Sequence, residues 1–240
     1  FFFHAHDGIR DFCLSRGLGD VYKRQKMKIV SNIMHPTPTA ANSGLEAAMK
    51  STEYWNSKCS IPQTLYRVIA GMPLGTMANS MRADDWASLS DAVVPMYTDE
   101  QNIRHQEEIG KYLSSAPESS IAEVVHMAGQ RPSAPTDIIS QTGARAMDAL
   151  GAAAWMTDMA NYVNHVTGHP NVVIQVGYGV PNSTVKPGSM AIVTYQDSTA
   201  EHDEATAKLR SDDGYLRRMA SANDYFDMSS FFNILMRKLI

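Results

Sequence analysis

Residues 54–73, YWNSKCSIPQTLYRVIAGMP, have a second copy at residues 162–181, YVNHVTGHPNVVIQVGYGVP. At a constant offset of 108 residues, six positions of the two stretches are identical. After a five-residue insertion the offset becomes 113, and eight further identities follow, among them Asp99 with Asp212. A repeat of this length indicates a duplicated domain, because solenoid and propeller units recur every 20 to 50 residues or so.

The repeat also divides the chain. Residues 1–26 lie outside it, and their FCLSRGLGDVYKRQ resembles translated sequencing-adapter sequence, so we exclude them from fold prediction. A strand pattern begins directly at Met27, MKIVSNIM, which makes this residue the natural start. We therefore expect a non-native or disordered extension over residues 1–26, a first repeat over residues 27–130 and a second over residues 131–240.

Each half has the predicted element order β-α-β-β-α-β. Alternating apolar residues predict strands over residues 28–34, 63–70, 76–82 and 120–127, and over 138–142, 172–178, 189–195 and 230–238. Helices are expected over residues 43–57, 86–96 and 102–113, and over 146–166 and 200–222. This order is the ferredoxin-like plan, an antiparallel sheet with two helices on one face. The bare face needs a cover, and we expect the sheet of the other half to supply it.

Two such units in tandem, a Trp or Tyr near the end of the first helix, and the hairpin Gly71-Met72-Pro73-Leu74-Gly75 resemble the dimeric α/β-barrel superfamily over residues 27–240. The resemblance implies an α+β fold in which both repeats close one pseudo-twofold barrel. It also implies three functions. The first is a small-molecule enzyme like the cofactor-free monooxygenases and isomerases of the superfamily. The others are a non-catalytic ligand-binding or oligomeric assembly protein, of the NIPSNAP-like or stress-responsive type, and a haem-binding barrel.

Composition narrows the partners. A net charge of −4 argues against nucleic acid as a binding partner. The sequence has no apolar run of about 18 residues, so we expect no membrane span. With Cys13 in the excluded extension, Cys59 stands alone, so we expect no disulfide framework and no cysteine-based metal site, and a reducing cytoplasm fits best. The sequence lacks the motifs of most cofactor classes. We therefore expect a protein that binds a small molecule and uses no cofactor or metal. Homo-oligomers joined through exposed strands or helices are a further expectation.

Comparison of the two copies sorts the strand faces. One face has a polar residue at the centre of each edge strand: Arg67, Gln175, Glu123 and Asn233. We assign this face to the barrel interior and the opposite, apolar face to the helices. Barrel closure is then expected to bring Arg67 near Asn233 and Gln175 near Glu123. Buried charges need partners, so this is either a polar site for an anionic or carbonyl ligand or a satisfied structural network.

His126 is the sharper candidate for catalysis. It is expected on the helix side of its strand, where the second half has Met236. An imidazole there could act as a general base, with Arg67 stabilising an anion, or as an axial haem ligand. The alternative is a core histidine bonded to a backbone carbonyl. His35, beside Pro36, is a weaker ligand-binding candidate, and Trp86 either lines an aromatic pocket or belongs to the core.

Overall fold

The computed structural model describes residues 27–130, 132–179 and 185–240. The extension expected over residues 1–26 lies outside them. The first half contains β1 (Lys28–Met34), α2 (Ala41–Lys58), β2 (Gln63–Ala70), β3 (Met77–Ala83), α3 (Trp86–Val93), α4 (Glu100–Gly110) and β4 (Glu118–Ala128). The second half contains β5 (Ile138–Ala146), α5 (Ala149–Thr167), β6 (Asn171–Gly179), β7 (Ser189–Gln196), α6 (Thr199–Arg210), α7 (Asp213–Ala220) and β8 (Phe226–Lys238).

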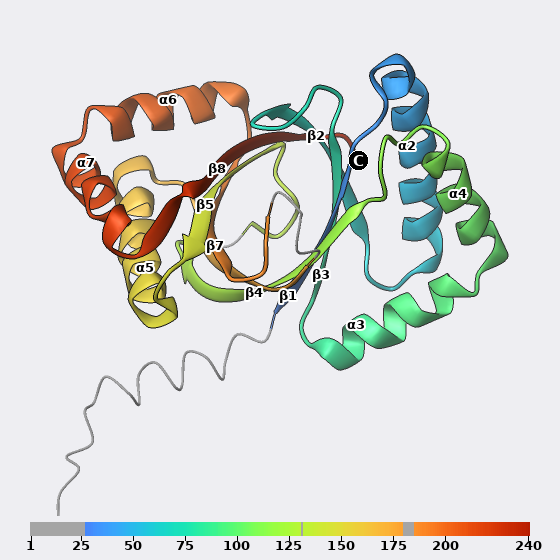
Figure 1. The fold of residues 1–240 in the computed structure, drawn as a ribbon, viewed down its shortest axis with the longest axis horizontal. Coiled ribbons are helices and arrows are strands. Elements are labelled where there is room, and N and C mark those ends of the chain that lie inside the picture. Colours follow the sequence, from blue (N-terminus) through green and yellow to red (C-terminus); the bar gives the residue numbers. More distant parts are fainter. Residues whose placement is uncertain (1–26, 131, 180–184) are drawn as a thin grey trace, which may run out of the picture.

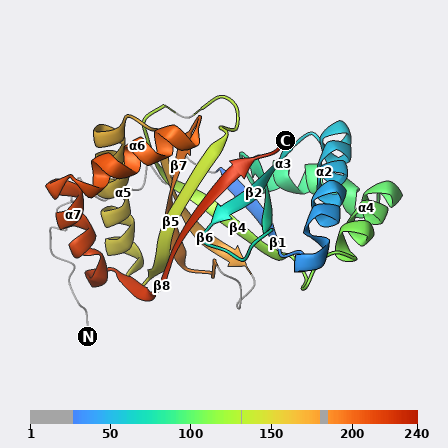
Figure 2. The ribbon, with the colours of Figure 1, turned by 90° about the horizontal axis from the view of Figure 1, so that it is seen from above.

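The eight strands form one closed barrel in the order β1-β3-β2-β8-β5-β7-β6-β4, and all neighbours are antiparallel. Two seams join the halves, one between β2 and β8 and one between β4 and β6. Helices α2, α3 and α4 cover one side of the barrel, and α5, α6 and α7 cover the opposite side (Figures 1 and 2). The predicted α+β fold with a closed barrel is therefore confirmed.

Equivalent helix ends in the two halves use the same chemistry. The side chains of Asp99 and Asp212 accept hydrogen bonds from backbone N–H groups in the first turns of α4 and α7. Tyr54 Oη donates to Asp99 Oδ1 at 2.9 Å, and Tyr162 Oη donates to Asp212 Oδ1 at 2.8 Å. A carboxylate that accepts several hydrogen bonds is stabilised in its charged form, so the pKa of both aspartates is lowered. These caps fix where the helices that cover each sheet begin.

The interior of the barrel is apolar, and the assignment of strand faces from the sequence was wrong. Fifteen buried residues, all from the strands except Val185, form the interior cluster, and Tyr66, Val68, Ile174 and Val176 belong to it. An eight-stranded barrel is just wide enough for side chains to fill, so the apolar faces turn inward. Arg67, Glu123 and Gln175 therefore lie on the outer face at the two seams, and Asn233 lies on the outer face of β8.

One of the two expected cross-seam pairs is present. Glu123 lies opposite Gln175 in the pairing of β4 with β6. Arg67 does not approach Asn233, because β2 pairs with the end of β8 and places Arg67 opposite Arg237. The stagger with which a sheet closes depends on the shear of the whole barrel, which no local sequence pattern specifies.

Candidate functional site

A cavity of about 270 Å³ lies between the outer face of the second-half sheet and helices α5, α6 and α7. This volume is just below the usual range for small-molecule sites, about 300–1,000 Å³. Its wall is mainly apolar and aromatic, formed by Trp155, Met156, Met159, Leu209, Met219, Phe226 and Phe231. Polar side chains line the rest of it, and the ionisable ones are His202, Arg210 and Tyr215. The cavity suits a planar apolar ligand that a few polar groups orient.

His202 of α6 is the titratable group of the cavity that changes charge near neutral pH. Its Nδ1 donates to Oε1 of the buried Gln196 at 3.1 Å, which fixes the proton on Nδ1. Nε2 is then an acceptor with no hydrogen-bond partner among the residues that the structure describes. Burial lowers the pKa of His202, partly offset by Asp203. The ring is thus held neutral, the form in which imidazole accepts a proton.

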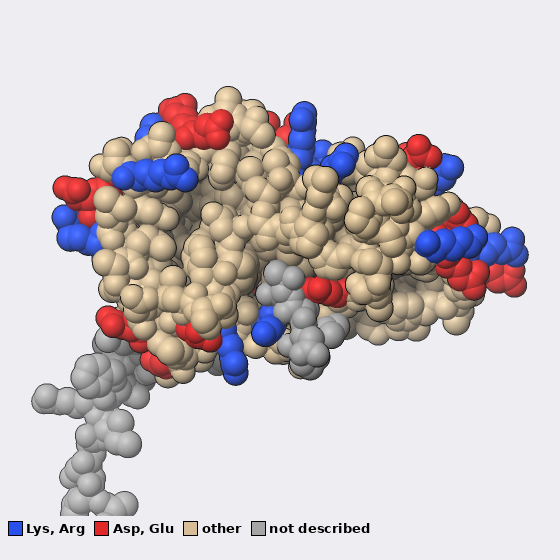
Figure 3. All heavy atoms as spheres, turned by 45° about the horizontal axis from the view of Figure 1, so that its top comes forward, with Lys and Arg blue, Asp and Glu red and all other residues tan. Residues whose placement is uncertain are grey.

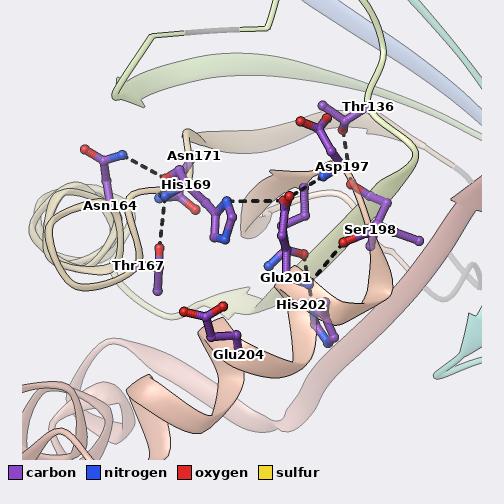
Figure 4. Close-up of polar contacts among 12 residues, drawn as sticks. Thr136, Asn164, Thr167, His169, Asn171, Asp197, Ser198, Glu201, His202 and Glu204 are labelled. Atoms are coloured by element: carbon purple, nitrogen blue, oxygen red, sulfur yellow. Dashed lines mark hydrogen bonds and ion pairs between the residues drawn. The ribbon is translucent and has the colours of Figure 1, made fainter.

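A polar network holds the start of α6, and with it His202 (Figure 4). Ser198 caps the helix by accepting from the backbone N–H of Glu201 at 3.2 Å. The Glu201 carboxylate folds back to accept from the backbone N–H of Asp197 at 3.0 Å, and His169 Nδ1 lies 4.0 Å from Glu201 Oε2. Asn164 in turn holds the backbone carbonyl of His169 at 2.8 Å. The end of α5 is thereby tied to the beginning of α6.

The sheet and the mouth of the cavity supply the remaining polar groups. Thr142 Oγ1 on β5 donates to Asn233 Oδ1 on β8 at 3.3 Å, which leaves the Asn233 amide N–H groups available as donors. The sequence singled out Asn233 as ligand-binding, and it lines this cavity. Arg210 lines it at an exposed position on the last turn of α6. The lining therefore contains a cation and an amide donor, two groups that stabilise negative charge on a ligand oxygen.

The first half has a cavity in the corresponding place, between its sheet and α2, α3 and α4, with a volume of about 460 Å³. Trp55, Trp86 and Tyr97 line it together with amides such as Asn32 and Asn79. Its described lining contains no Asp, Glu, His, Lys or Arg side chain. Acid–base chemistry is therefore available in the second-half cavity and lacking in the lining of the first.

The two histidines chosen from the sequence lie elsewhere. His126 points outward from β4 beside a strand irregularity, and its Nε2 lies 2.8 Å from Asn161 Oδ1 on α5. It is not among the lining residues of the four cavities described. His35 contacts Thr76 through Nδ1 and Glu118 through Nε2, both at 3.1 Å, beside a separate surface hollow.

Glu123 and Trp86 meet at the seam between β4 and β6. Glu123 forms an ion pair with Lys28, whose side chain is only 7% exposed, and the Lys28 amine lies 5.2 Å from the centre of the Trp86 ring. Trp86 also packs edge-on against Tyr178, with ring centres 5.3 Å apart. The cluster joins β1, β4, β6 and α3. We therefore interpret its contacts as structural ones that hold the two halves together.

We expect Glu123→Ala to lower the free energy of unfolding by about 1–2 kcal/mol, because Lys28 would keep its buried charge without a carboxylate. The loss stays below that of a fully buried pair, since the Glu123 side chain is 46% exposed and solvent screens it. Urea denaturation measures the change. Glu204→Ala is the matched control: its ion pair with Lys208 is exposed on both sides, and we expect a change below about 0.5 kcal/mol. Equal losses in both variants would contradict this account of the seam.

Sequence reasoning missed His202, although the signal was available. At the offset of 113, His202 corresponds to Leu89, which is buried in the first half. The same comparison of copies selected His126 against Met236, but it was applied to the strands alone. Applied to the helices, it points to a position where one half has an ionisable group and the other an aliphatic one.

The charged side chains on the face shown in Figure 3 do not indicate a particular class of binding partner. Cationic and anionic side chains are interspersed on the face shown in Figure 3, with wide uncharged areas between them. Among the described helices, none is both long and apolar enough to span a bilayer.

No family model and no curated protein matches the sequence. Among solved structures, an anthrone oxidase-like protein is similar with a TM-score of 0.65 and 13% identity, covering 90% of this chain and 92% of that one. A candidate monooxygenase from Fusobacterium nucleatum subsp. nucleatum has a TM-score of 0.65 and 7% identity, with coverages of 90% and 94%. A candidate chlorite dismutase has a TM-score of 0.51 and 10% identity, with coverages of 90% and 96%. At these identities the likeness shows the fold alone.

Proposed function

We propose that this protein is a cofactor-free oxygenase that binds a planar aromatic ketone or phenol in the second-half cavity and uses His202 as the general base. The observation that carries the proposal is the neutral imidazole of His202 in an apolar cavity, with Nδ1 held by Gln196 and Nε2 without a partner in the described part of the chain. The similarity of the fold to an anthrone oxidase-like protein and to a candidate monooxygenase adds support for this class.

The chemistry needs a substrate whose C–H bond is activated by conjugation to a carbonyl group, as in an anthrone. His202 Nε2 takes the proton, and the electron pair spreads through the rings onto the carbonyl oxygen. The Asn233 amide and Arg210 stabilise that oxygen as its charge grows. The carbanion then gives an electron to O₂, the two radicals combine to a hydroperoxide, and His202 returns its proton. Loss of water leaves a new carbonyl group, so one CH₂ and one O₂ give one C=O and one H₂O.

The apolar wall has a role beyond affinity. Trp155, Met159 and Phe226 present apolar surface to the site, so a bound substrate that displaces water there strengthens the interactions of His202 and Asn233 with the developing charges. The thioethers of the methionines adapt to the outline of the rings. A ligand of two or three fused rings suits a cavity of about 270 Å³.

Haem binding is the weaker alternative. The hypothesis built on His126 needs a free ring nitrogen facing a cavity, but Nε2 of His126 contacts Asn161 and the residue lines none of the described cavities. His202 lines a cavity of about 270 Å³, just below the usual range for small ligands, and Arg210 is the only Lys or Arg among the described residues of its lining. The described residues therefore do not fit a four-pyrrole macrocycle with two propionates.

The test is oxygen consumption by the purified full chain with a hydroxylated anthrone, after dialysis against a chelator and with an absorbance spectrum free of flavin and haem bands. We expect saturable turnover, one O₂ consumed per quinone formed, and a product mass raised by the exchange of two hydrogens for one oxygen. Binding of the anthrone without oxygen uptake would instead favour a ligand-binding protein. Neither binding nor uptake, with a defined large oligomer in native mass spectrometry, would favour an assembly role.

A further inference from the structure

The apolar barrel interior contains a row of three serine side chains. Ser31 of β1 lies opposite Ser80 of β3 on one side and opposite Ser120 of β4 on the other. All three line a cavity inside the barrel. None of their hydroxyl groups has a side-chain hydrogen bond within residues 27–130, 132–179 and 185–240, and none is sealed from the cavity. The row thus presents three unused hydroxyl groups to the interior.

Arg82 crosses the same interior. It lies two residues beyond Ser80 on the same face of β3, opposite Ile29. Its Nη2 donates to Tyr195 Oη at 3.2 Å, and its guanidinium carbon lies 5.2 Å from the centre of the Tyr195 ring. Strands β3 and β7 are four places apart in the closed order of eight strands, so this contact spans the barrel. The positive charge therefore sits inside the barrel and not on a helix-covered face.

The described lining of the cavity offers Arg82 no negative charge. No Asp or Glu side chain is among the described residues that line it, and Arg82 has no ion pair in the described part of the chain. Burial raises the pKa of Tyr66 to about 12, so this phenol stays protonated at neutral pH and is not a counter-ion. A guanidinium has five N–H donors, of which one is used by Tyr195. Arg82 is partly buried, and its other N–H groups have no hydrogen bond to the described residues.

We propose that the barrel interior is a binding site for a small carboxylate, held by the guanidinium of Arg82 and by the serine row. The cavity has a volume of about 70 Å³. One water needs about 10–15 Å³ on this scale, so the space corresponds to about five water positions. An anion the size of formate or acetate fits it, and its two oxygens match the fork of the guanidinium. This site is separate from the cavity of His202 and does not depend on the proposed function.

The test is a thermal unfolding series of the full chain in sodium acetate at constant ionic strength, with sodium pivalate as the matched ligand. Pivalate has the same charge and a similar basicity, but its tertiary butyl group is too bulky for the cavity. We expect acetate to raise Tm saturably, by about 5–10 °C at about 100 times its Kd, and pivalate to have no saturable effect. Equal shifts with the two anions would overturn the proposal.

Variants test whether the rise in Tm with acetate comes from binding at Arg82 and the serine row. Arg82→Met is expected to abolish the acetate shift, whereas Arg104→Gln, at an exposed position on α4, keeps it. If Arg82→Met does not fold, as judged by circular dichroism, Ser80→Ala decides: loss of one hydrogen bond lowers acetate affinity about two- to tenfold. A folded Arg82→Met that keeps the acetate shift overturns the proposal, and so does an unchanged affinity in Ser80→Ala.

Discussion

His202→Gln is expected to lower kcat for a hydroxylated anthrone by about 10²- to 10⁴-fold, with little change in KM. Glutamine is similar in size to histidine and still fills the position between Gln196 and the cavity. It has no group that accepts a proton near neutral pH, so the step that generates the carbanion is lost. Binding of the rings depends on the apolar wall, which the substitution leaves in place. Steady-state oxygen uptake with purified protein measures both constants.

The pH profile gives an independent check on the same residue. Because burial lowers the pKa of His202, the neutral base persists to lower pH than a free imidazole would. Activity should therefore decrease on acidification with a midpoint below the ordinary imidazole pKa of about 6.5. His126→Gln is the matched variant, since it removes the base predicted from the sequence. Loss of turnover in His126→Gln with retention in His202→Gln would move the base to β4.

Gly71→Ala is expected to lower the free energy of unfolding by about 3–5 kcal/mol. Gly71 has a φ of 91°, in the left-handed region, where a side chain costs on the order of 1–3 kcal/mol. A Cβ atom there would also lie 1.9 Å from the backbone carbonyl oxygen of Asn233 on β8. Backbone cannot rotate away as a side chain does, so the strand would have to shift, at a cost of about 1–3 kcal/mol. The hairpin after β2 and β8 would then no longer fit together at the seam.

Gly188→Ala separates the two contributions. Gly188 has a φ of 84° but no heavy atom within 4 Å of the position of an added Cβ. It therefore reports the cost of the backbone conformation alone, about 1–3 kcal/mol. Urea denaturation of both variants, with the same m-value as the parent protein, gives the comparison. If the two losses were equal, the contact between the hairpin and β8 would contribute nothing to the barrel.

The fold followed from local patterns to a large extent, because hydrophobic periodicity reports which backbone conformation buries one face. Residues 63–70 alternate and form β2 with the predicted bounds, while the helical region expected over residues 200–222 divides into α6 and α7 at Ser211 and Asp212. Asp212 caps the second helix with its side chain, a local signal that the longer periodicity concealed.

Which face of each strand turns into the barrel was harder to predict from the sequence. Each edge strand has an apolar face and a face with one central polar residue, and both faces are compatible with a helix cover or with an interior. The choice depends on the other seven strands, since the interior must be filled by all of them together. Arg82 illustrates the point: it is charged, it lies in the interior, and no local pattern around it indicates that its side chain turns inward.

The candidate site was predicted only in part. Asn233 lines the second-half cavity, and Glu123 lies opposite Gln175, but the proposed base is on a helix and not on a strand. A helix that packs over a sheet contributes its side chains from above, so residues distant in sequence meet there only after the sheet has closed. Copy-to-copy differences such as Leu89 and His202 are the feature of the sequence that marks this place.

The position of β8 between β2 and β5 sets the order in which the protein is able to complete its fold during synthesis. Strand β2 ends at Ala70, but its partner β8 extends to Lys238. At a translation rate of roughly 5–20 residues per second, the edge of β2 waits on the order of ten to thirty seconds for its neighbour. An unpaired strand edge is a template for pairing with other chains. The nascent first half therefore passes through a period in which it depends on charged edge residues such as Arg67, or on a chaperone, to remain monomeric.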